Sequence, residues 1–165
     1  MVFSSDDTSV LLSFTLTSTK GFHTTSITRL ALRGWRPPSC NLHLYFTLSA
    51  QLFADPYELD HRRASYTFQR FGGGNLEAPV FTPGSGRGAS SGLLLDLTIP
   101  ERRGGDDDQV EDVLSVEVPL HARYGMPKTE GRELIDQVVL RPPEAFWACA
   151  QEAAFGGDQG MATIS

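Results

Sequence analysis

The segment VPLHARYGMP, residues 118–127, holds the polar groups best suited to binding chemistry. His121 and Arg123 are two residues apart, so in an extended strand they share one face, opposite the apolar residues that alternate with them. With Tyr124 beside them, they could bind an anionic or carbohydrate group. Hydrogen bonding to a neighbouring loop would use the same side chains, so the residues alone leave a binding role and a structural role open.

A second unusual segment is FADPYEL, residues 53–59. Asp55 followed by proline predicts a turn, because proline fixes φ and the Asp side chain can accept a hydrogen bond from the backbone. Such a turn would place Tyr57 and Glu58 to bridge two elements, since a buried tyrosine needs a partner for its hydroxyl. Opposite charge suggests that Glu58 or Asp55 pairs with Arg123.

The remaining polar clusters do not indicate a catalytic centre or a metal site. The acidic run at residues 106–108 lacks the alternate spacing and closing Glu of an EF-hand loop, so a solvated turn is the better interpretation. The glycines at residues 72–74 lie in no phosphate-binding pattern, and no serine sits in GxSxG. The four histidines are too far apart for a local metal motif; they are His23, His43, His61 and His121. We therefore expect no cofactor and no metal.

Composition narrows the class of protein. The chain has 165 residues, of which 40% are hydrophobic and 21% charged, which indicates one globular domain. Its net charge of −6 disfavours nucleic acid as a partner. The two cysteines, Cys40 and Cys149, could form one long-range disulfide or remain two buried thiols, and the sequence alone leaves both open.

The sequence shows no apolar run of 18 residues, as a membrane helix would need, and acids stand where a signal peptide carries bases. From these features alone we expect a cytosolic protein, or one whose targeting segments lie outside this sequence.

The elements that must position these side chains are mostly strands. Period-two alternation dominates, most clearly at NLHLYFTLS, where Leu42, Leu44 and Phe46 share one face. Strands are predicted over residues 10–17, 24–32, 41–49, 65–71, 93–99, 113–120 and 134–140. Gly-rich and Pro-rich turns separate them, so the sequence predicts an all-β, antiparallel, β-sandwich-like domain.

The C-terminal part of the sequence predicts a short helix and the end of the domain. Residues 143–154 favour a short helix, with Glu144 early and Phe146 and Trp147 among its apolar positions, before two glycines. The predicted domain spans residues 1–155, and residues 156–165 form a flexible tail.

Five segments carry a family resemblance: GFH at residues 21–23, CNL at 40–42, DPYEL at 55–59, NLEAP at 75–79, and VPLHARY at 118–124 with Pro127. In this order they resemble the PIG-X family, Pbn-type in fungi, the accessory subunit of glycosylphosphatidylinositol (GPI) mannosyltransferase I. A proline-containing segment that closes on Cys149 is also similar, so the resemblance covers about residues 21–149. Thr24 departs from the family pattern, which has an arginine there.

The resemblance implies a type I membrane protein of the endoplasmic reticulum with a lumenal β-rich domain and a membrane helix that this chain lacks. In an oxidising lumen it also implies a Cys40–Cys149 disulfide. The family is non-catalytic: mannose transfer belongs to the partner PIG-M, which the accessory subunit stabilises. The residues expected to form the partner contact or its framework are His23, Asp55, Tyr57, Glu58, Glu77, His121, Arg123 and Tyr124.

Two other classes of function remain open at this stage. The first is a soluble carbohydrate-binding module that uses the face of His121, Arg123 and Tyr124. The second is a glycosidase or esterase whose carboxylates meet only in the fold, although no spacing supports it.

Overall fold

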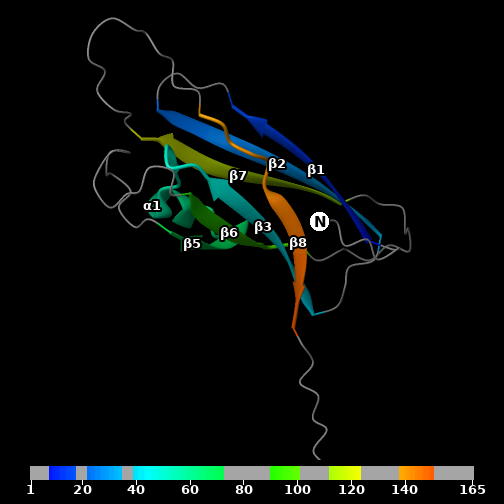
Figure 1. Ribbon diagram of the computed structural model, residues 1–165. Coiled ribbons are helices and arrows are strands. Elements are labelled where there is room, and N and C mark those ends of the chain that lie inside the picture. The colour runs from blue at the N-terminus through cyan, green and yellow to red at the C-terminus, as the bar shows by residue number, and fades with distance from the viewer. Residues whose placement is uncertain are drawn as a thin grey trace, which may run out of the picture.

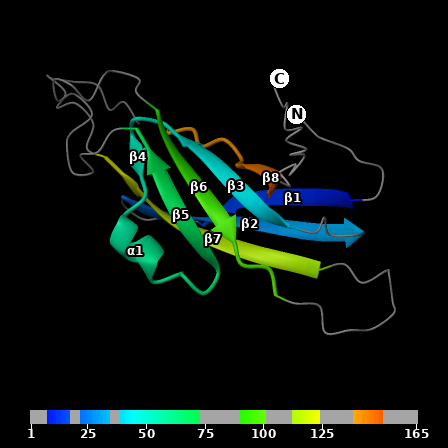
Figure 2. The ribbon, with the colours of Figure 1, turned by 90° about the horizontal axis from the view of Figure 1, so that it is seen from below.

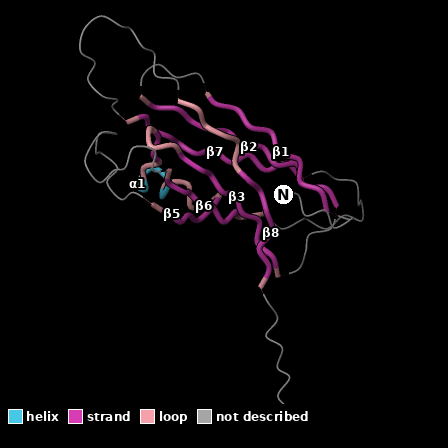
Figure 3. Tube along the Cα trace, viewed as in Figure 1, coloured by secondary structure: helices cyan, strands magenta, loops and turns pink. Residues whose placement is uncertain are grey.

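The computed structural model describes residues 8–17, 22–34, 39–72, 90–100, 112–123 and 138–150, and this described part of the chain is almost entirely β-structure (Figures 1 and 3). The elements are β1 (Thr8–Leu16), β2 (His23–Gly34), β3 (Cys40–Leu48), β4 (Leu52–Phe53), α1 (Pro56–Asp60), β5 (Tyr66–Phe71), β6 (Ser91–Leu97), β7 (Asp112–Ala122) and β8 (Glu144–Cys149).

The strands form two antiparallel four-stranded sheets, with orders β1-β2-β7-β4 and β5-β6-β3-β8. The sheets lie face to face, as the two perpendicular views show (Figures 1 and 2). The all-β prediction is therefore confirmed. Strand order was not predicted, because alternation specifies which face of a strand is buried and not which strand lies beside it.

The core lies between the two sheets. In β3 the even-numbered residues Leu42, Leu44 and Phe46 are fully buried, while the odd-numbered residues face outward. Its neighbour β6 adds Leu95 to the same cluster, and β2 and β7 of the facing sheet add Leu30 and Val118. The pattern that predicted the strands is thus the pattern that fills the core.

Six of the seven predicted strands are present, as β1, β2, β3, β5, β6 and β7. The strand predicted over 134–140 is not seen at residues 138–140, which have no regular structure, and its other residues lie outside the described part. The predicted domain boundary at residue 155 also lies outside it.

The helix predicted over residues 143–154 is wrong. Residues Glu144–Cys149 form strand β8, which pairs antiparallel with β3, and residue 150 has no regular structure; residues 151–154 lie outside the described part. Alternate side chains explain the difference: Ala145 and Trp147 pack against the core, whereas Phe146 faces outward. A six-residue run is too short for its period to decide between helix and strand, so pairing with β3 decides.

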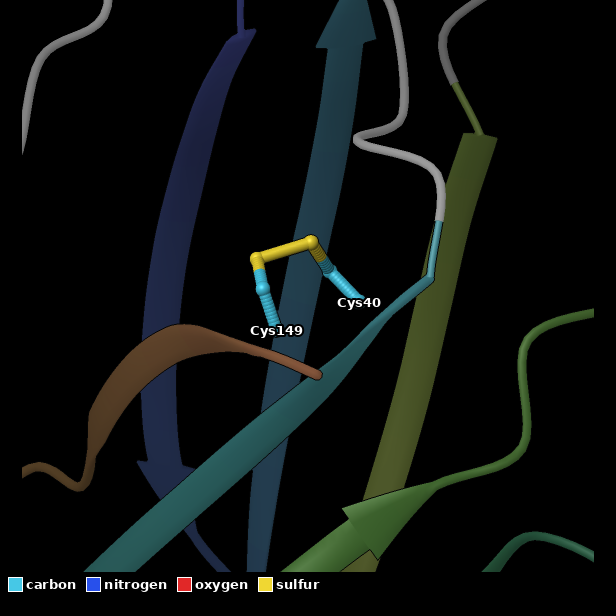
Figure 4. Close-up of a disulfide and its surroundings, with 2 residues drawn as sticks. All are labelled: Cys40 and Cys149. Carbon is cyan, nitrogen blue, oxygen red and sulfur yellow. A yellow bond between two sulfur atoms is a disulfide. The ribbon is translucent and has the colours of Figure 1, made fainter. Parts of the chain in front are cut away.

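Cys40 and Cys149 form a disulfide (Figure 4). They are the first residue of β3 and the last of β8, and the strand register places them directly opposite each other. The disulfide expected from the resemblance is therefore present. In the described part of the chain, no helix has the length and apolar character of a membrane span.

Candidate functional site

Three of the resembling segments meet at one end of the sandwich, which we call the α1 end. β2 begins there with His23, and the register places His23 opposite His121, near the end of β7. On the other side of β7, His121 is opposite Phe53 of β4, and α1 follows directly. The disulfide lies at the opposite end, because β3 starts there and runs back toward β4. Figure 1 shows α1 at the left and the ends of β3 and β8 below.

Local sequence explains why DPYEL forms a helix at this end. Asp55 is the N-cap, and its Oδ1 accepts a hydrogen bond from the Tyr57 amide at 2.9 Å. Pro56 takes the first helical position, where a missing N–H costs nothing. Leu59 is fully buried and fixes the helix to the core. The turn predicted here is thus the first turn of a short helix.

Replacing Asp55 with alanine should lower the free energy of unfolding by about 1 kcal/mol, because the Tyr57 amide loses its acceptor. Urea denaturation measures this loss. Asp60→Ala is the matched control: Asp60 is exposed at the other end of α1 and pairs with Arg63, so its removal should change stability by less than about 0.5 kcal/mol. Equal losses for the two variants would contradict a capping role.

Tyr57 and Glu58 leave α1 in different directions. The Tyr57 side chain is 81% exposed, so the expectation that it bridges two elements from a buried position is wrong. Glu58 does bridge elements, since its Oε2 lies 2.9 Å from Nε2 of His121. Helix geometry accounts for the difference, because neighbouring residues on a helix point to different sides.

His121 is the centre of a small cluster, the His121 cluster, made of His23, Phe53, Glu58 and His121. Its imidazole stacks on Phe53 with 5.0 Å between ring centroids and meets the edge of His23 at 4.5 Å. Only 12% of the His121 side chain is exposed, against 44% for Glu58. The cluster ties β2, β7, β4 and α1 together, and most of the imidazole is covered by protein.

The predicted pairing of Arg123 with Glu58 or Asp55 is replaced by other contacts. Glu58 contacts His121, and Asp55 caps α1. The Arg123 guanidinium lies over the Phe53 ring, 5.3 Å from its centroid, and the Arg123 amide donates to Gln51 at 2.7 Å. Partial burial lowers the pKa of Arg123 from its ordinary value.

A second group of contacts holds the segment after α1 against β7, and sequence reasoning did not find it. Arg62 Nη1 donates to Glu117 Oε2 at 2.8 Å, and the Tyr66 hydroxyl donates to the Glu117 carbonyl at 3.1 Å. Burial raises the pKa of Tyr66 to about 12. These residues are 51 and 55 positions apart in the sequence, so no local pattern could have paired them.

Two predicted site residues, Glu77 and Tyr124, lie outside the described part of the chain. The acidic run at residues 106–108 lies outside it as well. Among the described residues, no three His, Cys, Asp or Glu side chains gather as metal ligands would.

The framework of the α1 end is thus built from segments that are far apart in the sequence. The model of the PIG-X / PBN1 family matches residues 19–162, a range that includes these segments. The chain belongs to the PIG-X / PBN1 family. In this chain, the part of the family match that the structure describes folds as the antiparallel sandwich of Figure 1, with a disulfide at one end. No solved structure matches the chain.

Three curated relatives of this chain come from fungi. "Protein pbn1" of Neurospora crassa is 34% identical over 145 residues, which are 80% of this chain and 26% of that protein. "Protein PBN1" of Gibberella zeae is 33% identical over 156 residues, 88% of this chain and 29% of the relative. "Protein pbn1" of Emericella nidulans is 30% identical over 147 residues, which are 80% of this chain and 26% of that protein. The chain spans about a quarter of the length of these relatives.

Proposed function

We propose that this chain acts in GPI-anchor biosynthesis as a non-catalytic accessory subunit of GPI mannosyltransferase I, and that it stabilises the catalytic subunit, PIG-M. Membership of the PIG-X / PBN1 family is the observation that carries this proposal. The fold supports it through the α1 end, where the described residues of three resembling segments, 22–23, 55–59 and 118–123, come together.

The α1 end has the features of a protein contact surface. Its interior is a packed framework around His121, while large side chains stay exposed around it: Phe22 before β2, Tyr57 on α1 and Phe71 at the end of β5. Aromatic residues are enriched in protein interfaces and often supply most of the binding energy. Binding lumenal loops of the catalytic subunit through such a surface would stabilise its folded form by mass action.

The disulfide supports a place in the lumen of the endoplasmic reticulum, because disulfides persist in oxidising compartments and are rare in the cytosol. In this proposal a membrane helix outside this sequence anchors the domain.

The carbohydrate-binding alternative has less support. A glycan site on the face of His121 needs an accessible ring, but Phe53, His23 and Glu58 cover the imidazole. Sugar binding to purified domain on a glycan array, with no association with the catalytic subunit, would favour that alternative.

The test is to express this domain, fused to a signal peptide and a membrane helix, in cells that lack the endogenous accessory protein. We expect the surface level of a GPI-anchored reporter to recover. The variant Phe22→Ala with Tyr57→Ala should lose this recovery, since both side chains are exposed and remote from the core.

The matched control is Leu11→Ala with Val113→Ala, which removes two exposed apolar side chains near the disulfide end. This variant should restore the reporter as the unchanged domain does. A folded, correctly localised domain that neither restores the reporter nor co-purifies with the catalytic subunit would contradict the proposal.

A further inference from the structure

The outward face of the β5-β6-β3-β8 sheet carries aromatic side chains. In β3 and β8 the residues that alternate with the core residues include His43, Tyr45 and Phe146, and the register places His43 directly opposite Phe146. The rings of this pair stack with 5.4 Å between their centroids and 21° between their planes. Phe146 is 42% exposed, so the pair presents aromatic surface to solvent. In Figure 2, β3, β5 and β6 of this sheet lie in front of the other sheet.

A glycine lets the Tyr45 ring lie across the neighbouring strand. A Cβ atom at Gly92 of β6 would lie 2.5 Å from the Tyr45 hydroxyl oxygen and 3.0 Å from its ring atoms Cε2 and Cζ. Any other residue at this position would therefore displace the ring. Tyr45 stays partly exposed in this position. Its ring is thus positioned before a ligand binds, which lowers the entropy lost on binding.

Hydrogen-bonding side chains lie beside these rings on the same face. Asp96 of β6 is opposite His43, and its Oδ2 accepts a hydrogen bond from the Asn41 side-chain amide at 3.4 Å. Glu144 of β8 is exposed and lies opposite Tyr45. Carboxylates accept hydrogen bonds, and the amide of asparagine can both donate and accept them. The face therefore combines aromatic rings with strong acceptors.

This combination favours a carbohydrate over the other ligands that bind a sheet face. A sugar ring has a C–H face that packs on an aromatic ring, and hydroxyls at its rim that donate to carboxylates. The centre of a protein interface is depleted of charged residues, and anionic lipid attracts Lys and Arg, whereas Asp96 and Glu144 lie beside these rings. The four strands span about 14 Å at the usual spacing, which is enough for a short oligosaccharide.

We propose that the outward face of this sheet binds a neutral oligosaccharide. Its sugar rings pack on Phe146, His43 and Tyr45, and its hydroxyls donate to Asp96 and Glu144. This face belongs to the sheet that does not contain His121, so the site differs from the one considered above. The inference does not rest on the proposed accessory role, because it is tested on the purified chain with sugars alone.

Titration of the ¹⁵N-labelled chain with neutral oligosaccharides of glucose, of mannose and of N-acetylglucosamine tests the proposal. We expect saturable chemical-shift changes at the amides of β3, β6 and β8. Tyr45→Ala and Phe146→Ala should each weaken binding about tenfold, because each removes a ring on which a sugar packs. Both side chains are partly exposed, and unchanged amide shifts in β2 and β7 will show that each variant keeps the fold.

Tyr57→Ala is the matched control, since Tyr57 is an exposed aromatic residue of α1 and lies outside this sheet. Retained affinity in this variant, with loss in Tyr45→Ala and Phe146→Ala, supports the proposal. Oligogalacturonate should bind more weakly than the neutral sugars, because Asp96 and Glu144 repel its carboxylates.

Three results would overturn the proposal: no saturable binding to any neutral sugar, equal losses in all three variants, or shift changes confined to the α1 end. If Tyr45→Ala instead lost association with the catalytic subunit while the unchanged chain bound no sugar, the face would be a protein contact. That result would overturn the carbohydrate site as well.

Discussion

Removal of the disulfide, by Cys40→Ala with Cys149→Ala, should lower the free energy of unfolding by about 4 to 5 kcal/mol. The two cysteines are 109 residues apart, so the bond closes a loop that contains every described element except β1 and β2. A loop of this length restricts the unfolded chain strongly, and most of the stabilisation is lost when the loop opens. For a domain of this size that is a large part of its total stability.

Strand β8 should be the first element to lose protection. Among the strands that the structure describes, β8 lies at the edge of its sheet and pairs only with β3. Two of its side chains, Ala145 and Trp147, pack against the core. With so little buried area, β8 depends on the covalent bond at its last residue. Hydrogen exchange of the β8 amides should therefore speed up more in the double variant than exchange in β2 or β7.

Urea denaturation with and without reductant provides the control for this prediction. Reductant should bring the unchanged chain close to the double variant and should leave the double variant as it is. If the free energies of unfolding of the oxidised chain and the double variant differ by less than about 1 kcal/mol, the disulfide adds little to the stability of the fold.

The fold class could be predicted because the alternation of apolar and polar residues within a strand shows which of its faces is buried. In β3, alternation from Leu42 to Leu48 is complete, and both its faces behave as the sequence indicates. In β8, the apolar residues run together from Ala145 to Cys149, so alternation was hidden and a helix was predicted. The strand forms because β3 offers an edge to pair with, which is information from outside the segment.

The site could be predicted only as a set of segments. VPLHARY and DPYEL were recognised, and the strand face of His121 was right, but its partner was not. Glu58 and His121 are 63 residues apart, and Phe53 belongs to a two-residue strand that no periodicity reveals. Opposite charge favoured Arg123 as the partner of Glu58, yet the direction of α1 places the carboxylate against His121. Pairings that depend on the direction of a short helix follow from the fold and not from local sequence.

His121→Ala should destabilise the domain by about 2 to 3 kcal/mol, the largest effect expected at the α1 end. The mutation removes a mostly buried ring that stacks on Phe53, meets His23 and contacts Glu58. The lost ring leaves a cavity beside Phe53, and loss of a buried aromatic ring costs several kcal/mol when the site cannot close. Urea denaturation measures this loss. A change in the free energy of unfolding of less than about 0.5 kcal/mol would show that the His121 cluster does not stabilise the fold.

His121→Phe separates packing from the polar contact. It keeps a ring against Phe53 and His23 and loses only the hydrogen bond to Glu58, which is half exposed, so the loss of stability should be about 1 kcal/mol. If the cluster is a framework that positions exposed residues such as Tyr57, this variant should still restore the GPI-anchored reporter. A well-folded His121→Phe domain that fails to restore it would instead make the His121 imidazole itself a contact for the partner, because packing would be intact and only the imidazole chemistry would be lost.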